Sequence, residues 1–193
     1  MKTIWITLLG VCLYLPGWLQ AALTIEITQG VEGALPIAVV PFAAPNDRQP
    51  PQDVAGIIAA DLARSGRFAP VPEQNLIAQP VDTSQVRFQD WRTLGVENLV
   101  IGSVETVAGN EYRIQFRVFD VLRGRQITGY SIPSKPVQVR YVAPRICDIN
   151  YETLTGEPGA CATHIASVIT DSKNGIKEYK LQRAYSDGYN PKT

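Results

Sequence analysis

A short apolar strand followed at once by a capped helix constrains the fold more than any other feature of the sequence. Residues 37–42 form a continuous apolar run ending in Pro-Phe, which is typical of a buried strand. After a Pro-rich stretch at 43–51, Asp53 is suited to cap a helix that ends before Gly66, and residues 68–71 indicate another short strand. A strand, a helix and a strand in this order predict an α/β layer in which the helix covers one sheet face.

Apolar side chains at helical spacing support this helix and a second one. In the first helix, the side chains at this spacing are Val54, Ile57, Ile58, Asp61 and Leu62. In the second, residues 137–154, the apolar face consists of Val139, Val142, Ile146, Ile149 and Leu154. Pro144 falls inside the second segment and removes a helical hydrogen bond, so this helix either begins near Ala143 or is kinked there.

The middle of the chain indicates three antiparallel strands. Residues 98–107 and 112–119 are strand sequence joined by a tight turn at 108–110, and the alternation slips near Phe119. Residues 126–132 form the third strand. Three such strands with one face open to water, together with two main helices, predict an α/β (α+β) two-layer sandwich with a mixed sheet.

The last part of the chain has a different pattern. Residues 164–170 and 176–183 are strand sequence separated by a polar turn. Repeated strand pairs are typical of all-β units, but a propeller blade takes about 40–45 residues, more than follow Gly159. Because residues 155–159 carry strong helix-ending signals, we expect an α/β domain at 34–159 and an incomplete propeller blade at 160–193.

The first 21 residues have the pattern of a secretory signal peptide. Lys2 supplies the positive end, residues 4–15 are mostly apolar, and small residues at Ala21 and Ala22 suit cleavage. The apolar stretch is shorter than the about 20 residues of a membrane-spanning helix. We therefore expect export to the periplasm and no membrane span after the signal peptide is removed.

Apolar and polar residues alternate directly after the expected cleavage site. Leu23, Ile25 and Ile27 share one side of an extended chain, and Gly30 and Gly33 follow. Such a strand can dock on its own domain or add itself to the edge of a partner's sheet. The alternation alone leaves both possibilities open.

Two cysteines, Cys147 and Cys161, remain after signal cleavage. An oxidising compartment permits a disulfide between them. A disulfide also needs a narrow range of Cα separation, which spacing along the chain does not establish. We therefore expect two partly buried free thiols.

Charge and motifs disfavour nucleic-acid binding and catalysis. The net charge is +0 and the pI is ≈ 6.6, whereas nucleic-acid-binding domains are usually basic, with a pI above about 9. His164 is the only histidine, and no nucleophile elbow, phosphate loop or zinc-binding helix motif is found. We expect no catalytic residue, no cofactor and no metal site. A solvated charged sheet face is expected from Arg113, Arg117, Arg123, Arg125 and Arg140.

Several segments occur in a fixed order: residues 36–42 (PIAVVPF), 57–68 (IIAADLARSGRF), 91–97 (WRTLGVE), 99–104 (LVIGSV), 151–160 (YETLTGEPGA) and 186–190 (SDGYN). With the signal peptide and the extended terminus, they resemble the TolB family, periplasmic components of the Tol-Pal system of Gram-negative envelopes. The likeness covers the N-terminal domain and the start of the first propeller blade, which implies a C-terminally truncated member. The family usually has Ser near Cys147 and Phe near Cys161, so both cysteines depart from its pattern.

The resemblance implies a non-enzymatic periplasmic adaptor that supports outer-membrane integrity, cell division and protein or colicin import. In the family the N-terminal segment is linked to TolA, an inner-membrane protein, while the propeller carries the lipoprotein Pal. A Pal-like partner is therefore implied only where a full propeller is present. Transferred to this sequence, the partner-binding residues are Ala22, Leu23, Thr24, Ile25, Glu26, Ile27, Thr28, Gln29, Gly30, Val31, Glu32 and Gly33. Two alternatives stay open: a periplasmic solute-binding or hydrolytic α/β protein, and a nonfunctional truncated reading frame.

Overall fold

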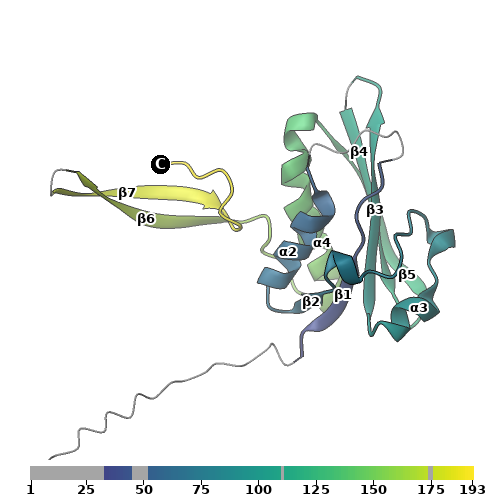
Figure 1. Cartoon of the computed structure of the whole chain (residues 1–193). Helices are drawn as coiled ribbons and strands as arrows, with labels where there is room; N and C mark the ends of the chain where they lie inside the picture. The colour runs from purple at the N-terminus through teal and green to yellow at the C-terminus, as the bar shows by residue number, and fades with distance from the viewer. Residues whose placement is uncertain (1–32, 45–51, 110, 174–175) are drawn as a thin grey trace, which may run out of the picture. The chain divides into compact units, whose positions relative to one another are not determined.

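A computed structural model of the chain describes residues 33–44, 52–109, 111–173 and 176–193 (Figure 1). The predicted signal peptide and residues 22–32 of the predicted partner-binding segment lie outside these residues. Among the described residues, no helix has the length and apolar character required to cross a membrane.

A five-stranded mixed sheet forms the centre of the α/β domain, in the order β2-β1-β3-β4-β5 (Figure 1). Strand β1 (Leu35–Val39) runs parallel to β2 (Phe68–Pro70) and to β3 (Asn98–Val107). Strands β3, β4 (Glu111–Asp120) and β5 (Arg125–Ser134) form the predicted antiparallel meander. The β4–β5 register shifts between Val118 and Phe119, where the alternation slips in the sequence.

Helix α2 (Val54–Arg64) connects β1 to β2 and packs on the sheet. Asp53 caps it as predicted, accepting a hydrogen bond from the Gly56 backbone N–H at 2.9 Å. Gly66 follows the helix with a φ of +71°, a conformation that favours glycine. The buried side chains of α2 are Val54, Ala55, Ile58, Asp61 and Leu62. The predicted helix is therefore confirmed, including a carboxyl group on its apolar side.

Helix α4 (Val139–Thr155) contains Pro144 and begins before it, directly after the short 3-10 helix η3 (Pro136–Gln138). The expected alternative start near Ala143 is therefore wrong. Pro144 has no N–H to donate to the Arg140 carbonyl, but it is buried together with Val142 and Ala143. Burial of these apolar side chains thus stabilises the helix despite the missing hydrogen bond.

Two apolar cores lie on opposite faces of the sheet, because alternate residues of β1 and β3 enter different cores. The larger core, which includes Ile58, Phe116 and Ile146, lies between the sheet and helices α2 and α4. The smaller core packs under α3 (Phe88–Thr93) around Trp91, and the segment leading to α3 contains the 3-10 helices η1 (Glu73–Asn75) and η2 (Thr83–Gln85). The sheet face that was expected to be open to water is therefore covered at one end by α3 and the segment before it.

Strands β6 (His164–Lys173) and β7 (Ile176–Tyr185) form a separate two-stranded antiparallel sheet. Both predicted strands are confirmed and are longer than expected. The side chains of the hairpin are mostly exposed, with Val168 at 65% and Leu181 at 69%. A two-stranded hairpin of this kind is at best marginally stable alone, so its attachment to the rest of the chain matters.

Cys147 of α4 and Cys161 form a disulfide, so the expectation of two free thiols is wrong. Their Cα atoms are 6.0 Å apart, a normal separation for this bond. The chain leaves α4 through Gly156, whose φ is 78°, and turns back toward the same helix. Spacing along the sequence does not reveal that return.

Candidate functional site

Of the residues predicted to bind a partner, only Gly33 lies in the described part of the chain. It is exposed, its φ is +103°, and an added Cβ would meet nothing within 4 Å. It precedes the first residue of β1, Leu35, by two positions. The positive φ favours glycine at this position, shortly before the sheet begins.

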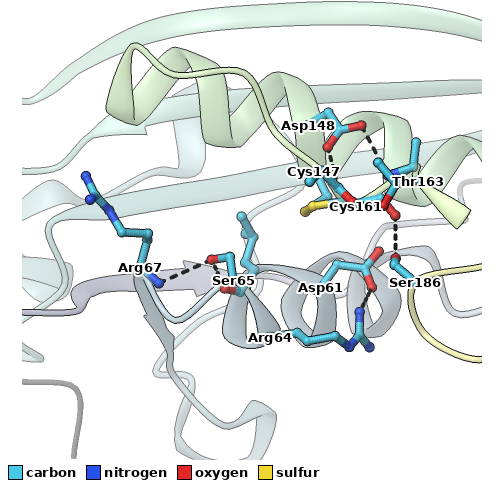
Figure 2. The surroundings of a disulfide bond; sticks show 12 residues. Asp61, Arg64, Ser65, Arg67, Cys147, Asp148, Cys161, Thr163 and Ser186 are labelled. Carbon is cyan, nitrogen blue, oxygen red and sulfur yellow. Dashed lines mark hydrogen bonds and ion pairs between the residues drawn. A yellow bond between two sulfur atoms is a disulfide. The ribbon is translucent and has the colours of Figure 1, made fainter. Parts of the chain in front are cut away.

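The described residues also form a polar and covalent cluster at the base of the hairpin, shown in part in Figure 2. We call this cluster the junction. It consists of Asp61, Arg64, Arg140, Cys147, Asp148, Cys161, Ser186 and Asp187. The sequence drew attention to Arg140 and the cysteines but not to the pairing among these residues. Asp61, a carboxyl group at an apolar helix position, is the feature of the sequence that could have pointed to a buried charge here.

Hydrogen bonds around the disulfide hold the segment after α4 against that helix (Figure 2). The Asp148 carboxylate accepts from the Cys161 backbone N–H at 2.6 Å and from the Ala162 N–H at 3.2 Å. The Ser186 hydroxyl donates to the Cys161 carbonyl at 2.7 Å. A Cβ added to Gly159 would lie 2.7 Å from the Asp148 Cα, so glycine permits the close approach.

A second set of contacts fixes the end of β7. Arg140 of α4 forms an ion pair with Asp187, and its guanidinium lies 4.7 Å from the centre of the Tyr189 ring. Tyr141 packs beside Tyr185, with ring centres 5.3 Å apart. Burial alone would raise the pKa of Asp187, but the Tyr189 N–H and the Arg140 guanidinium together hold that pKa below its ordinary value. The paired carboxylate is therefore favoured at neutral pH.

The Asp61 carboxylate, unlike that of Asp187, is only partly compensated by its surroundings. Its side chain is 1% exposed, and one carboxylate oxygen pairs with Arg64 at 2.5 Å. The other oxygen, Oδ2, has no hydrogen-bond partner among the described residues. Burial raises the pKa of Asp61, and Arg64 only partly offsets this effect.

The junction borders a shallow groove of ≈ 280 Å³ along α2. Its charged lining residues include Asp61, Arg64, Arg140 and Asp187, and these already pair with one another. Asp61, Cys147 and Cys161 also place possible metal-ligand atoms within 4.8 Å of one another, but the disulfide occupies both sulfurs. This arrangement is therefore more typical of a structural contact between the hairpin and the α/β domain than of an ion-binding site.

The other residues discussed from the sequence are dispersed. His164 is exposed, and its ring centre lies 4.3 Å from that of Tyr185. The arginines do not form one face, because Arg117 lies near Asp82 on the sheet whereas Arg140 belongs to α4. Arg123 is held by Asp120 at 2.7 Å. The expectation of one arginine-rich sheet face is therefore wrong for Arg140.

Comparison with known proteins shows relatives that match the α/β domain described above. The model of the TolB amino-terminal domain matches residues 23–127, more than half of the chain. The chain belongs to the TolB amino-terminal domain family. The Tol-Pal system protein TolB of Nitrosococcus oceani is 51% identical over 176 residues, which cover 90% of this chain and 40% of that protein. The TolB of Thioalkalivibrio sulfidiphilus is 46% identical over 188 residues, covering 96% of this chain and 43% of the relative.

A solved structure of a TolB protein has the same fold. The crystal structure of TolB from Acinetobacter baumannii matches with a TM-score of 0.71 and 29% identity, covering 83% of this chain and 38% of that one. The chain therefore spans about 40% of the length of the TolB relatives that it matches. These relatives are named as Tol-Pal system proteins, and membership of the family agrees with the mixed α/β fold predicted from the sequence.

Proposed function

We propose that this TolB-family chain is a non-enzymatic periplasmic adaptor of the Tol-Pal envelope complex. The match to the TolB amino-terminal domain carries this proposal, because its relatives are Tol-Pal system proteins. The signal-peptide pattern of residues 1–21 supports a periplasmic location. The self-paired charges of the junction and the exposed position of His164 fit a protein that acts through contacts rather than catalysis.

In the proposed mechanism, residues 22–33 offer an extended peptide to a TolA-like inner-membrane protein. Backbone hydrogen bonds to a sheet edge would provide affinity, and Leu23, Ile25 and Ile27 would fill pockets on the partner. Gly33 supports this reading because its exposed backbone has a positive φ two positions before β1 begins. The α/β domain at 34–159 then serves as the folded body that carries the peptide.

Further roles follow from the same proposal. The complex would support outer-membrane integrity, cell division and the import of proteins such as colicins. Residues 160–193 would begin the first blade of a propeller, and a Pal-like lipoprotein would bind only where that propeller is complete.

A binding measurement tests the proposed adaptor. The chain without its signal peptide is titrated with the periplasmic domain of a TolA-like protein from the same organism. Replacing Ile25 and Ile27 with threonine keeps strand propensity but removes apolar contact, so we expect binding at least about tenfold weaker. The matched control replaces Thr24 and Thr28 with serine on the other side of the strand and retains binding. Equal affinity of the two variants would reject the mechanism.

A further inference from the structure

The β6–β7 hairpin is attached to the α/β domain at its base. Every described side chain from Ala162 to Arg183 is exposed or half-buried, and the first buried residue on the return strand is Ala184. The ladder from His164–Tyr185 to Lys173–Ile176 holds the two strands to each other. Among the described residues, the contacts that join the hairpin to the α/β domain therefore lie at its base.

The covalent and noncovalent contacts at this base act on the same short segment. The disulfide joins α4 to Cys161 across a separation of 14 residues. Asp148, the next residue after Cys147, accepts hydrogen bonds from the backbone of Cys161 and Ala162. Ser186 joins the end of β7 to the same segment, both through its hydroxyl and through its N–H, which donates to the Thr163 carbonyl at 3.0 Å. Breaking the disulfide at Cys161 therefore weakens the attachment of the hairpin both before β6 and after β7.

We propose that the Cys147–Cys161 disulfide is a redox-sensitive lock on the base of the β6–β7 hairpin. A dithiol reductant breaks the S–S bond by supplying two electrons and two protons. Both cysteines become thiols, and the dithiol becomes a disulfide. The hairpin base then opens locally while the five-stranded sheet stays folded. This inference does not depend on the proposed adaptor function.

Local opening gives a reductant its route to the bond. Cys147 is fully buried, whereas Cys161 is 7% exposed and lies in a turn rather than in a helix or strand. The Asp148 carboxylate keeps that turn closed through its two backbone hydrogen bonds. Asp148 is thus a positioning residue. When its carboxylate is lost, the turn opens more often and the reductant reaches the disulfide more often.

The first test measures amide exchange by NMR in the chain without its signal peptide, oxidised and after treatment with dithiothreitol. Because a cross-link over 14 residues strongly restricts an open segment, we expect the Cys161 and Ser186 amides to exchange about 100-fold faster after reduction. The Phe116 amide in the sheet serves as an internal reference and stays unchanged. Unchanged junction rates, or equal acceleration at Phe116, would overturn the proposal. So would a bond that dithiothreitol cannot reduce until the sheet unfolds.

The second test uses the rate of reduction and needs no cysteine variant. The Cys161 and Ala162 N–H groups donate to different oxygens of Asp148. Asp148→Asn leaves one neutral acceptor oxygen and replaces the other with a donor, so we expect the bond to be reduced about tenfold faster. Glu152→Gln is the matched control, since it removes the same charge from an exposed site on α4. Equal reduction rates in the two variants would contradict opening at the 161–162 turn.

Discussion

Replacing Asp61 with asparagine is expected to stabilise the α/β domain at neutral pH, although the substitution removes one partner of an ion pair. The wild-type carboxylate is 1% exposed, and its Oδ2 has no partner among the described residues, which costs about 1–3 kcal/mol. Its partner Arg64 is 43% exposed, so the pair itself is worth about 0–1 kcal/mol. Asparagine keeps one acceptor oxygen for Arg64 and replaces the charged, unpartnered Oδ2 with a neutral amide group, so the cost of burying a charge is removed. We expect the free energy of unfolding to rise by about 1 kcal/mol.

The pH dependence identifies the buried charge as the cause. Burial raises the pKa of Asp61 above its ordinary value of 3.8, so the folded chain keeps this proton to a higher pH than the unfolded chain does. Its stabilising contribution is present below the unfolded pKa and is lost as the pH rises through the folded pKa. The advantage of Asp61→Asn therefore shrinks toward acidic pH.

Urea denaturation followed by tryptophan fluorescence between pH 3 and pH 7 measures both effects. The control variant, Asp90→Asn, removes a carboxylate that is 48% exposed and lies 3.9 Å from Arg87, and it is expected to change stability by less than about 0.5 kcal/mol. A less stable Asp61→Asn at neutral pH, or a difference that does not vary with pH, would refute this reasoning.

Other predictions concern single positions. Asp53→Ala removes the cap of α2 and is expected to lower the free energy of unfolding by about 1 kcal/mol in urea denaturation; an unchanged midpoint would contradict the cap. An alanine Cβ at position 102 would lie 2.5 Å from the Phe42 ring, so Gly102→Ala is expected to cost about 1–3 kcal/mol, with partial recovery when Phe42→Leu is added. Since Arg140 helps to lower the pKa of Asp187, the pair stabilises the hairpin base above the unfolded pKa, and this contribution is lost as the pH falls through the folded pKa. The protection factors of the amides at the base, which compare each exchange rate with the intrinsic rate at the same pH, are therefore expected to fall in acid in the wild type, and to be low already at neutral pH in Asp187→Asn.

Local signals in the sequence were sufficient to predict most of the α/β domain. The Asp53 cap, Gly66 and the slip near Phe119 each depend on residues close together in the chain, and each occurs where expected. The sequence alone allows the helix around Pro144 to begin near Ala143, because the general rule for proline in helices considers only its missing N–H. Burial of the surrounding α4 residues, which this rule does not include, favours the longer helix.

The junction could not be derived in the same way. Its contacts join residues far apart in the sequence, such as Arg140 with Asp187 and Cys147 with Cys161. Whether such residues meet depends on how the chain turns after Gly156 and on where β7 ends. Asp61 lies among the apolar positions of its helix, but the helical spacing alone does not indicate which residues surround it.

Strand pairing by residues 22–33 is the central claim about function, and amide exchange in the complex tests it most directly. The isotope-labelled chain without its signal peptide is measured alone and with the periplasmic domain of a TolA-like protein. Strand addition predicts that alternate amides between Leu23 and Thr28 become protected only in the complex, while the amides of α2 are unaffected. Binding with no protection in this segment, or with new protection confined to the α/β domain, would contradict the account.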